Sequence, residues 1–386
     1  MYRTVFSSSI ADIDKADWQA IVGPDYPFIQ YAFLKALEDT GAVGEDSGWA
    51  AQHILVYRNE RLVALAPSYL KTHSYGEYVF DWAWADAFHR YGREYYPKLV
   101  TAIPFTPVTG PRICVAAGED ETTILDEMVD TIRSAAMAQH FSSWHLLFPA
   151  KAISDEVGKN TMQRCAVHFQ WRNEGYASFE AFLAEFSSRK RKNLRKEREK
   201  VRAAEIEFEV LSGHDITEAI WDDYYLFYQI TYARRSGHGG YLDREFFSAL
   251  SNTMPETLVL VMAKRHGEYI AGALNFRGKD TLYGRYWGCK ADFDFLHFET
   301  CYYQGIDYCI REGLQRFDPG VQGEHKLQRG FRPTYTYSNH IIAEPVFEAA
   351  IRDFLGREKP QVEAYFEEAC SYLPFKAQAP VPHAPD

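Results

Sequence analysis

Residues 257–276 read Thr257-Leu-Val-Leu-Val-Met-Ala-Lys-Arg-His-Gly-Glu-Tyr-Ile-Ala-Gly-Ala-Leu-Asn-Phe276, in which two apolar runs flank a charged turn. Apolar runs of this length, rich in β-branched residues and separated by a polar turn, are typical of two antiparallel strands. The same strand, charged turn and strand occur earlier, from His53 to Pro67. The chain therefore carries one structural pattern twice.

The elements that follow each pair of strands also repeat. A third strand, a helix and a short apolar strand are expected after each pair. Their ranges are 78–84, 121–140 and 143–148 in the first half, and 282–287, 297–313 and 315–318 in the second. A meander followed by a helix and a strand predicts an α+β fold with a mixed central sheet, formed twice.

Length and composition fit a globular protein with more than one core. The chain has 386 residues, of which 46% are hydrophobic and 16% aromatic. At roughly 150 residues per domain, two or three domains are expected. The expected ranges are an N-terminal unit at 1–165, a C-terminal unit at 166–345, a final helix at 346–375 and a disordered, Pro-rich tail at 376–386.

Cysteine usage and hydropathy indicate a cytoplasmic protein. The six cysteines are scattered, with no Cys-x-x-Cys pair, which favours reduced thiols over disulfides or a zinc site. The N-terminus lacks the apolar core of a signal peptide, and no apolar run approaches the roughly 18 residues that cross a bilayer.

One segment departs from the overall negative charge. The net charge is −11, which argues against general affinity for nucleic acid. Between residues 189 and 202, however, nine residues are basic and two are acidic. A helix that begins near Ser178 and a second, basic helix at 187–204 are expected here. The alternatives are a solvated charged surface and a phosphate-binding site, and we favour phosphate contact. The candidate contacts are Arg189, Arg191, Asn193 and Arg195.

The segment 317–332, Phe-Asp-Pro-Gly-Val-Gln-Gly-Glu-His-Lys-Leu-Gln-Arg-Gly-Phe-Arg, has the composition of a site. Its glycines let the backbone approach a ligand, while Glu, His, Lys and Arg supply a base, a proton shuttle and anion-binding donors. A polar surface loop without chemistry is the alternative. The position of the segment directly after the last short strand favours a site.

Tandem repetition of a meander, helix and strand resembles a pair of GNAT N-acyltransferase folds. The segment Ser187-Ser-Arg-Lys-Arg-Lys-Asn-Leu-Arg-Lys-Glu-Arg198 resembles the Ser-x-Lys-x-Arg-x-Asn-Ile-Arg-Lys signature of the FemAB-like peptidoglycan-bridge aminoacyltransferases. Nearly all of residues 1–375 is similar to the bacterial "peptidoglycan biosynthesis/recognition" branch of that superfamily. The segments that carry this similarity are Phe105-Thr-Pro-Val-Thr-Gly-Pro-Arg112, Gly284-Arg-Tyr-Trp-Gly288 and Leu296-His-Phe-Glu-Thr-Cys-Tyr-Tyr-Gln304.

The resemblance implies an acyltransferase whose donor is not coenzyme A. In ordinary GNAT acetyltransferases a glycine-rich loop binds the coenzyme A pyrophosphate through backbone N–H groups. The equivalent connection here, 289–299, has no glycine and two aspartates. FemAB-like enzymes also lack this loop and use aminoacyl-tRNA. The resemblance therefore implies no tightly bound cofactor, an aminoacyl-tRNA donor that contacts the basic helix, and a small-molecule or peptide amine as acceptor.

Acyl transfer to an amine needs a base, an oxyanion donor and an acid for the leaving group. We predict that Glu324 or His325 deprotonates the amine and that Lys326 stabilises charge on the carbonyl oxygen. Neighbouring residues point in different directions, so not all three can face one substrate. The other candidates of this segment, which bind substrate, are Asp318, Gln322, Arg329 and Arg332.

Further candidates for substrate binding lie outside the loop. Alternation puts Arg285 and Tyr286 on opposite faces of their strand. The helix that follows carries His297, Glu299 and Gln304, and Arg112 is the candidate in the first half. A metal site formed by His297, Glu299, His325 and His340 is disfavoured, because no compact ligand motif such as His-Glu-x-x-His occurs.

Two other functions stay open at the level of sequence. One is an N-acetyltransferase that uses acetyl-CoA or another acyl-CoA. The other is a degenerate GNAT pair that binds a nucleotide-linked or peptide ligand without turnover.

Overall fold

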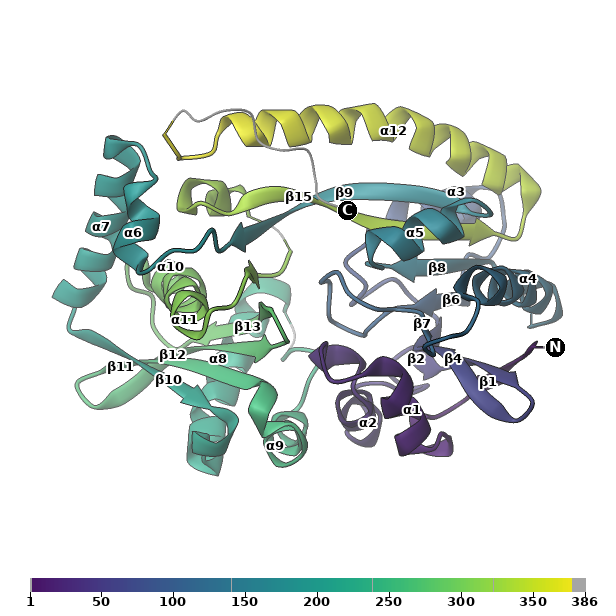
Figure 1. Cartoon of the computed structure of the whole chain (residues 1–386), viewed down its shortest axis with the longest axis horizontal. Helices are drawn as coiled ribbons and strands as arrows, with labels where there is room; N and C mark the ends of the chain where they lie inside the picture. The colour runs from purple at the N-terminus through teal and green to yellow at the C-terminus, as the bar shows by residue number, and fades with distance from the viewer. Residues whose placement is uncertain (1, 140, 238, 322, 377–386) are drawn as a thin grey trace. The chain divides into compact units, whose positions relative to one another are not determined.

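The computed structural model describes residues 2–139, 141–237, 239–321 and 323–376, which form two compact units (Figure 1). Of the described residues, unit 1 contains 2–167 and Tyr335–Tyr365, and unit 2 contains His168–Thr334 and 366–376. Both units are discontinuous in sequence, whereas the ranges expected from the sequence are consecutive. Three elements carry the chain between the units: β9 (Met162–Arg172), β15 (Arg332–Ile342) and α12 (Pro345–Ser371).

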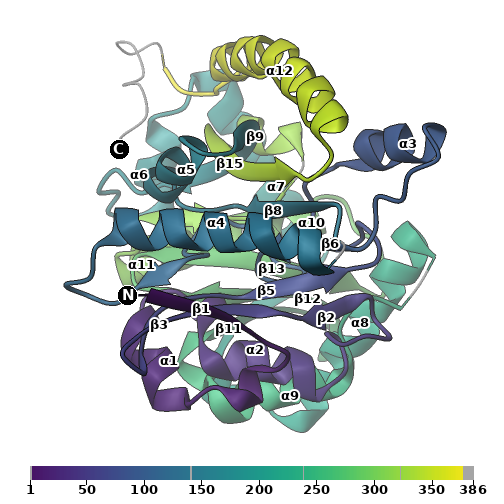
Figure 2. The same cartoon turned by 90° about the vertical axis from the view of Figure 1, so that its right-hand side faces the viewer.

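Unit 1 is built on a mixed sheet of order β15-β8-β6-β5-β2 and an antiparallel sheet of order β1-β3-β4-β7. Its strands are β1 (Tyr2–Ser7), β2 (Trp49–Ala51), β3 (His53–Arg58), β4 (Arg61–Ala66), β5 (Ser68–Lys71), β6 (Lys98–Thr101), β7 (Cys114–Val115) and β8 (Ser143–Leu147). Its helices are α1 (Lys15–Val22), α2 (Tyr31–Asp39), α3 (Trp82–Arg90), α4 (Glu121–Gln139) and α5 (Lys151–Gly158). Figure 2 faces α4, whose Ile132 packs with Val63 and Trp144 in one apolar core.

Unit 2 contains strands in the order β10-β11-β12-β13-β14-β9. Its further elements are α6 (Phe179–Ala184), α7 (Ser188–Ala203), β10 (Ile206–Ser212), α8 (Glu218–Ser236), α9 (Arg244–Thr253), β11 (Leu258–Arg265), β12 (Glu268–Arg277), β13 (Thr281–Cys289) and β14 (Arg316–Asp318). One continuous helix follows β13 and consists of α10 (Leu296–Phe298), a π-helical segment (Glu299–Tyr303) and α11 (Gln304–Glu312). A 3-10 helix, η6 (Glu324–Arg329), precedes β15.

Helix α8 packs closely against β13 because a glycine faces it. A side chain at Gly288 would place its Cβ 2.2 Å from the backbone of Phe227, so only glycine fits. The helix begins at the Thr217 cap, whose hydroxyl accepts the Ile220 N–H, and ends at Gly237 in the left-handed conformation. This contact fixes the C-terminal end of α8 beside the end of β13.

Strands β13 and β14 of unit 2 diverge, which opens the sheet at one place. They are parallel and pair only from Thr281 with Arg316 to Tyr283 with Asp318. Beyond this point β13 continues to Cys289, while the other chain turns away after Asp318. Past Tyr283, β13 therefore lacks a β14 partner, and Gly284 lies beside Pro319 and Gly320.

Most expected elements are present. The paired strands at 53–66 and 258–276, the helices at 121–139 and 296–312, and the helix starts at Ser178 and after Ser187 are confirmed. The expected strand at 78–84 is wrong, because residues from Trp82 form helix α3. Trp84 and Phe88 are four residues apart and pack on one face with Tyr95, which is helical spacing.

The final helix, expected at 346–375, is α12 and ends at Ser371. The tail expected at 376–386 lies outside the described residues from 377 on. No helix in the described part of the chain is long and apolar enough to cross a bilayer.

Candidate functional site

Asp318 ends β14 inside unit 2. Its side chain is 2% exposed and accepts hydrogen bonds from the Gly320 N–H at 3.0 Å and from Gln170 Nε2 at 2.9 Å. Burial raises the pKa of this carboxyl, and the hydrogen bonds lower it in part. Asp318 thereby fixes the turn at which β14 leaves β13.

Lys326, on η6, lies beneath the same turn. Its side chain is 2% exposed, and its Nζ donates to the carbonyl oxygens of Gly320 at 2.6 Å and Val321 at 3.3 Å. Burial lowers the pKa of Lys326 to about 8, and the charge of Asp318 opposes this shift. At pH 7 the amine is still mostly protonated, so it places a positive charge where β13 and β14 diverge.

Arg285 lies next to this turn because of a bulge. The pairing of β13 with β12 skips Arg285, which makes it an extra residue in the strand. Its Nη1 would be 3.3 Å from a Cβ on Gly320. The structure therefore brings Arg285, which the sequence placed outside the loop, close to Asp318 and Lys326.

His325 supplies a neutral imidazole beside Lys326. Its Nε2 is 2.9 Å from the hydroxyl of Tyr302. Burial and neighbouring positive charges lower the pKa of His325 to about 4, so the ring is uncharged at pH 7 and can accept a proton. Tyr302 belongs to the π-helical segment Glu299–Tyr303, and such segments occur frequently at functional sites.

Glu299 and Gln304 are engaged in an internal ion-pair network. Glu299 is 3% exposed and accepts hydrogen bonds from Arg198 Nη2 and Gln304 Nε2, both at 2.8 Å. Arg198 also pairs with Asp307 at 2.8 Å. Because Arg198 lies on the basic helix α7, this network anchors α7 to the helix that follows β13.

Arg329 also connects to α7. Its guanidinium is 2.9 Å from the carboxylate of Glu197 and donates to the carbonyl oxygen of His325 at 2.8 Å. It also lies over the ring of Phe298, 3.4 Å from its centroid. Tyr303 donates its hydroxyl proton to the same Glu197 carboxylate. These contacts hold η6 in place and make Arg329 a support of the loop.

The outer face of α7 keeps several cations available. Arg195 pairs with Glu180 at 2.5 Å, and Arg191 donates to the carbonyl oxygen of Ala184 at 3.3 Å. Asn193 is exposed. No described residue forms a hydrogen bond or ion pair with the exposed side chains of Arg189, Lys192 and Lys196.

Two predicted residues are buried in cores. The ring of Tyr286 faces Tyr228 at 5.9 Å and Phe247 at 6.1 Å between centroids, on the side of α8 and α9. Arg112, in unit 1, is 1% exposed and donates to the carbonyl oxygen of Val108 at 2.6 Å. The structure does not bring either residue into the group around Lys326.

The remaining loop residues differ in exposure. Glu324 is exposed, and Arg332 pairs with Glu174 at 2.7 Å. Gln322 lies outside the described residues.

Within the described ranges no group of three or more His, Cys, Asp and Glu side chains is arranged to hold a metal ion.

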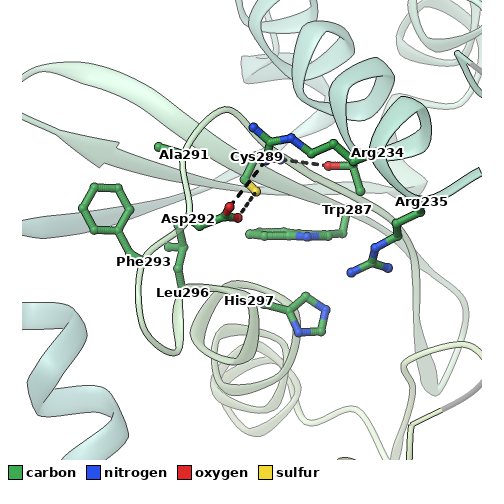
Figure 3. Close-up of a pocket in the computed structure, with 10 residues that line it drawn as sticks. Arg234, Arg235, Trp287, Cys289, Ala291, Asp292, Phe293, Leu296 and His297 are labelled. Carbon is green, nitrogen blue, oxygen red and sulfur yellow. Dashed lines mark hydrogen bonds and ion pairs between the residues drawn. The ribbon is translucent and has the colours of Figure 1, made fainter. Parts of the chain in front are cut away.

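A pocket of about 160 Å³ lies at the end of β13 (Figure 3). His297 is the predicted residue that lines it. The other lining residues are Thr231, Arg234, Arg235, Trp287, Cys289, Ala291, Asp292, Phe293 and Leu296. The His297 ring lies 5.3 Å from that of Tyr302 between centroids, so the pocket adjoins the group around His325.

Several residues of this region were not predicted from the sequence. Gln170, Arg235 and Tyr302 were not candidates, although each contacts a candidate or lines the pocket with one. Gln170 and Arg235 lie in segments far from the loop in sequence. Only the family resemblance of the segment Leu296–Gln304 carried a signal for Tyr302.

Unit 1 contains a second buried polar cluster. Lys98 Nζ lies 2.8 Å from Glu77 and also pairs with Asp81. The hydroxyl of Tyr95 donates to Asp81 at 2.7 Å. Nearby, Lys71 is fully buried, and burial lowers its pKa to about 6. Burial raises the pKa of Glu77 to about 7.

The family of the chain follows from its match to a sequence-family model. Residues 9–377 match FemAB-like proteins, described as peptidoglycan biosynthesis/recognition. The chain belongs to the FemAB-like family. No curated protein sequence matches the chain.

Two solved structures share the fold of the FemAB-like chain. FemX matches with a TM-score of 0.52 at 12% identity, over 90% of this chain and 99% of FemX. The C-terminal domain of a putative lysylphosphatidylglycerol synthetase from Agrobacterium fabrum matches with a TM-score of 0.52 at 11% identity, over 89% of this chain and 95% of that domain. At these identities the likeness concerns the fold.

Proposed function

We propose that this FemAB-like protein transfers an aminoacyl or related acyl group to an amine. The observation that carries the proposal is the buried ammonium of Lys326, held at the point where β13 and β14 diverge, 2.6 Å from the Gly320 carbonyl oxygen. A fixed positive charge in a site shielded from water stabilises a developing oxyanion. The family description, peptidoglycan biosynthesis/recognition, supports a peptide or nucleotide-linked muropeptide as the amine acceptor.

The reaction would proceed by attack of the amine nitrogen on an ester carbonyl. An N–C bond forms, the C–O bond to the leaving group breaks, and Lys326 stabilises the negative charge on the carbonyl oxygen between these events. His325, neutral at pH 7, accepts the proton that the amine loses and returns it to the leaving oxygen. Glu324 is the alternative base. Both side chains are exposed enough to meet a substrate.

We propose aminoacyl-tRNA as the donor. The outer face of α7 supports this choice, since Arg189, Lys192 and Lys196 are exposed and have no partner among the described residues. Arginine and lysine side chains bind phosphates of a nucleic-acid backbone. The 289–299 connection also lacks the glycines that bind coenzyme A in other GNAT folds.

Donor competition tests the proposal. Transfer to a nucleotide-linked muropeptide is measured with total aminoacyl-tRNA and with acetyl-CoA as donors, and binding of each is followed by thermal shift. We expect binding and transfer with aminoacyl-tRNA only. Transfer from acetyl-CoA alone would establish an N-acetyltransferase instead, and binding of the muropeptide without transfer from either donor would indicate a binding protein.

Replacement of the buried lysine tests the assigned centre. We expect Lys326→Met to lower kcat at least about a hundredfold, the usual effect of losing an oxyanion donor. Lys264→Met removes a partly exposed lysine of the same unit and should leave kcat unchanged. Circular dichroism confirms that both variants fold. Equal kcat values for Lys326→Met and wild type would exclude Lys326 from the reaction.

A further inference from the structure

The two arginines of the pocket at the end of β13 differ in their ion pairing. Arg234 Nη1 lies 3.6 Å from the carboxylate of Asp292. Arg235, the next residue of α8, has an exposed side chain that forms no hydrogen bond or ion pair with any described residue. Figure 3 shows the Arg235 side chain turned away from the Arg234–Asp292 pair and toward Trp287 and His297. Arg235 is therefore a guanidinium of the pocket that no described carboxylate pairs with.

Other groups of the pocket add a donor and an apolar wall. The hydroxyl oxygen of Thr231 accepts the Cys289 N–H at 3.2 Å, which leaves its own proton for another acceptor. The ring of His297 packs edge-on to Trp287 at 5.3 Å between centroids. Trp287 and Leu296 contribute apolar surface. The lining therefore suits a group that is anionic at one end and apolar along its side.

The size and place of the pocket restrict its occupant. A cavity of about 150 Å³ holds a molecule the size of benzene, and this pocket measures about 160 Å³. The ring of His297 contacts that of Tyr302, and the Tyr302 hydroxyl oxygen lies 2.9 Å from His325 Nε2. The occupant is therefore a small part of a substrate that lies close to the reacting atoms.

We infer that this pocket binds a carboxylate on a small group of the substrate, with Arg235 as its counter-ion and Thr231 as a second donor. The inference rests on the proposed function for the place of this group in the reaction. A carboxylate on an apolar stem fits better than a phosphate, because the pocket joins the guanidinium of Arg235 to the apolar surface of Trp287 and Leu296. The carboxylate belongs either to an acidic side chain of the transferred aminoacyl group or to an amino-acid acceptor.

Binding of small probes to the whole protein tests the pocket itself. Glutarate, its uncharged analogue glutaramide and inorganic phosphate are titrated calorimetrically into wild type, Arg235→Gln and Arg311→Gln. Arg311 is an exposed arginine of α11 outside the pocket, so its variant controls for the loss of one surface charge. We expect glutarate to bind wild type and Arg311→Gln alike, and Arg235→Gln at least about tenfold more weakly, as for a lost charge-assisted hydrogen bond.

Three results would overturn the inference. These are phosphate binding tighter than glutarate, glutaramide binding as tightly as glutarate, and equal glutarate affinities in Arg235→Gln and Arg311→Gln. Glutarate binding should persist in Lys326→Met, since that lysine does not line the pocket. If no donor supports transfer but glutarate binding still depends on Arg235, the proposed function fails while the carboxylate pocket stands.

Transfer assays separate the two sources of the carboxylate. Aspartyl-tRNA is paired with an amine that has no carboxylate, and alanyl-tRNA is paired with an amino acid as acceptor. We expect Arg235→Gln to raise KM at least about tenfold in one of these pairs and to leave the other unchanged. Unchanged KM values in both pairs, with transfer intact, would refute the inference without affecting the proposed function.

Discussion

At the scale of single residues, burial decides which groups of the loop before β15 can act. Glu324, His325 and Lys326 are consecutive in a 3-10 helix, in which successive side chains point about 120° apart. Lys326 points inward under the turn that follows Asp318, whereas Glu324 is exposed. The residue types and their place after β14 were predictable from sequence. The depth of Lys326 was not, because it depends on how residues distant in sequence pack around it.

The pH dependence of transfer should reflect two of these groups. His325 must be neutral and Lys326 protonated, and their pKa values are lowered to about 4 and about 8. We expect kcat/KM to rise as pH increases through 4 and to fall as pH increases through 8, once the titration of the acceptor amine is divided out. In Lys326→Arg the fall above pH 8 should disappear, because arginine stays protonated. A retained fall in that variant would assign it to another group.

Lys71 in unit 1 should make stability depend on pH. Its pKa is about 6 in the folded protein against the ordinary 10.5, so the unfolded chain binds more protons between these values. Stability therefore rises with pH in this window, by up to about 1.4 kcal/mol per pH unit. Glu77, with a pKa raised to about 7, has the opposite effect only below pH 7. Between pH 7 and 9 the contribution of Lys71 is therefore not masked by Glu77.

The measurement is urea unfolding of wild type and Lys71→Met at pH 7, 8 and 9, since the difference between the two proteins cancels the titrating groups that do not interact with Lys71. We expect Lys71→Met to be the more stable protein at pH 7, with an advantage that shrinks toward pH 9. If the free energies of unfolding of wild type and Lys71→Met change with pH in parallel, Lys71 keeps its ordinary pKa. Lys35→Met, at an exposed lysine of the same unit, is the control.

At the scale of elements, alternation and helical spacing predicted strands and helices reliably where each face of the element is consistently buried or consistently exposed. The strands β11 and β12 and the helices α4 and α7 follow such patterns. The patterns failed where aromatic residues are dense, as in α3, since Trp82-Ala-Trp84 fits either alternation or a helix. Local irregularities were not predictable either. The bulge at Arg285 and the π-helical segment Glu299–Tyr303 interrupt the regular pattern of their elements, and both lie at the candidate site.

Helix α7 divides its charges between two faces, and this gives a prediction for nucleic-acid binding. Arg198 is committed to Glu299 and Asp307, whereas the outer face is open. Replacement of Arg189, Lys192 and Lys196 by Gln should weaken tRNA binding. The slope of log K against log salt should become shallower by about 0.7 to 0.9 per lost phosphate contact.

Fluorescence anisotropy with labelled tRNA at several salt concentrations measures this slope. Replacement of Arg352, Arg357 and Lys359 by Gln on α12 removes the same charge elsewhere and should leave the slope unchanged. If both triple variants behave alike, tRNA responds to net charge and α7 has no special role. If neither changes affinity, α7 is a solvated surface.

At the scale of the whole chain, unit 2 is completed by residues from the far C-terminal part of the sequence. The Ser187 N–H donates to the carbonyl oxygen of Pro374 at 3.0 Å, and the Lys376 N–H donates to that of Glu185 at 2.8 Å. The ring of Phe375 lies 5.1 Å from that of Phe186 between centroids. These contacts join 374–376 to the junction of α6 and α7. Pairing across such a separation leaves no local signal in the sequence.

The C-terminal segment should therefore control the order of the basic helix. Phe375→Ala removes a ring that packs on the ring of Phe186 and also contacts the guanidinium of Arg332. We expect the free energy of unfolding to fall by about 2 kcal/mol. This is less than the roughly 3–5 kcal/mol lost when a fully buried phenylalanine is replaced by alanine, because Phe375 is only half-buried. Amide hydrogen exchange should accelerate in 179–203, while unit 1 stays unchanged.

Tyr372→Ala is the matched control, because Tyr372 is an aromatic residue of the same segment that is 55% exposed. It should leave exchange in 179–203 unchanged. If Phe375→Ala accelerates exchange there and also weakens tRNA binding, the C-terminal segment positions the phosphate-contacting face of α7. If exchange in α6 and α7 is the same in both variants, the basic helix is ordered by Arg198 and its acidic partners alone, and the contact with Phe375 contributes nothing to the site.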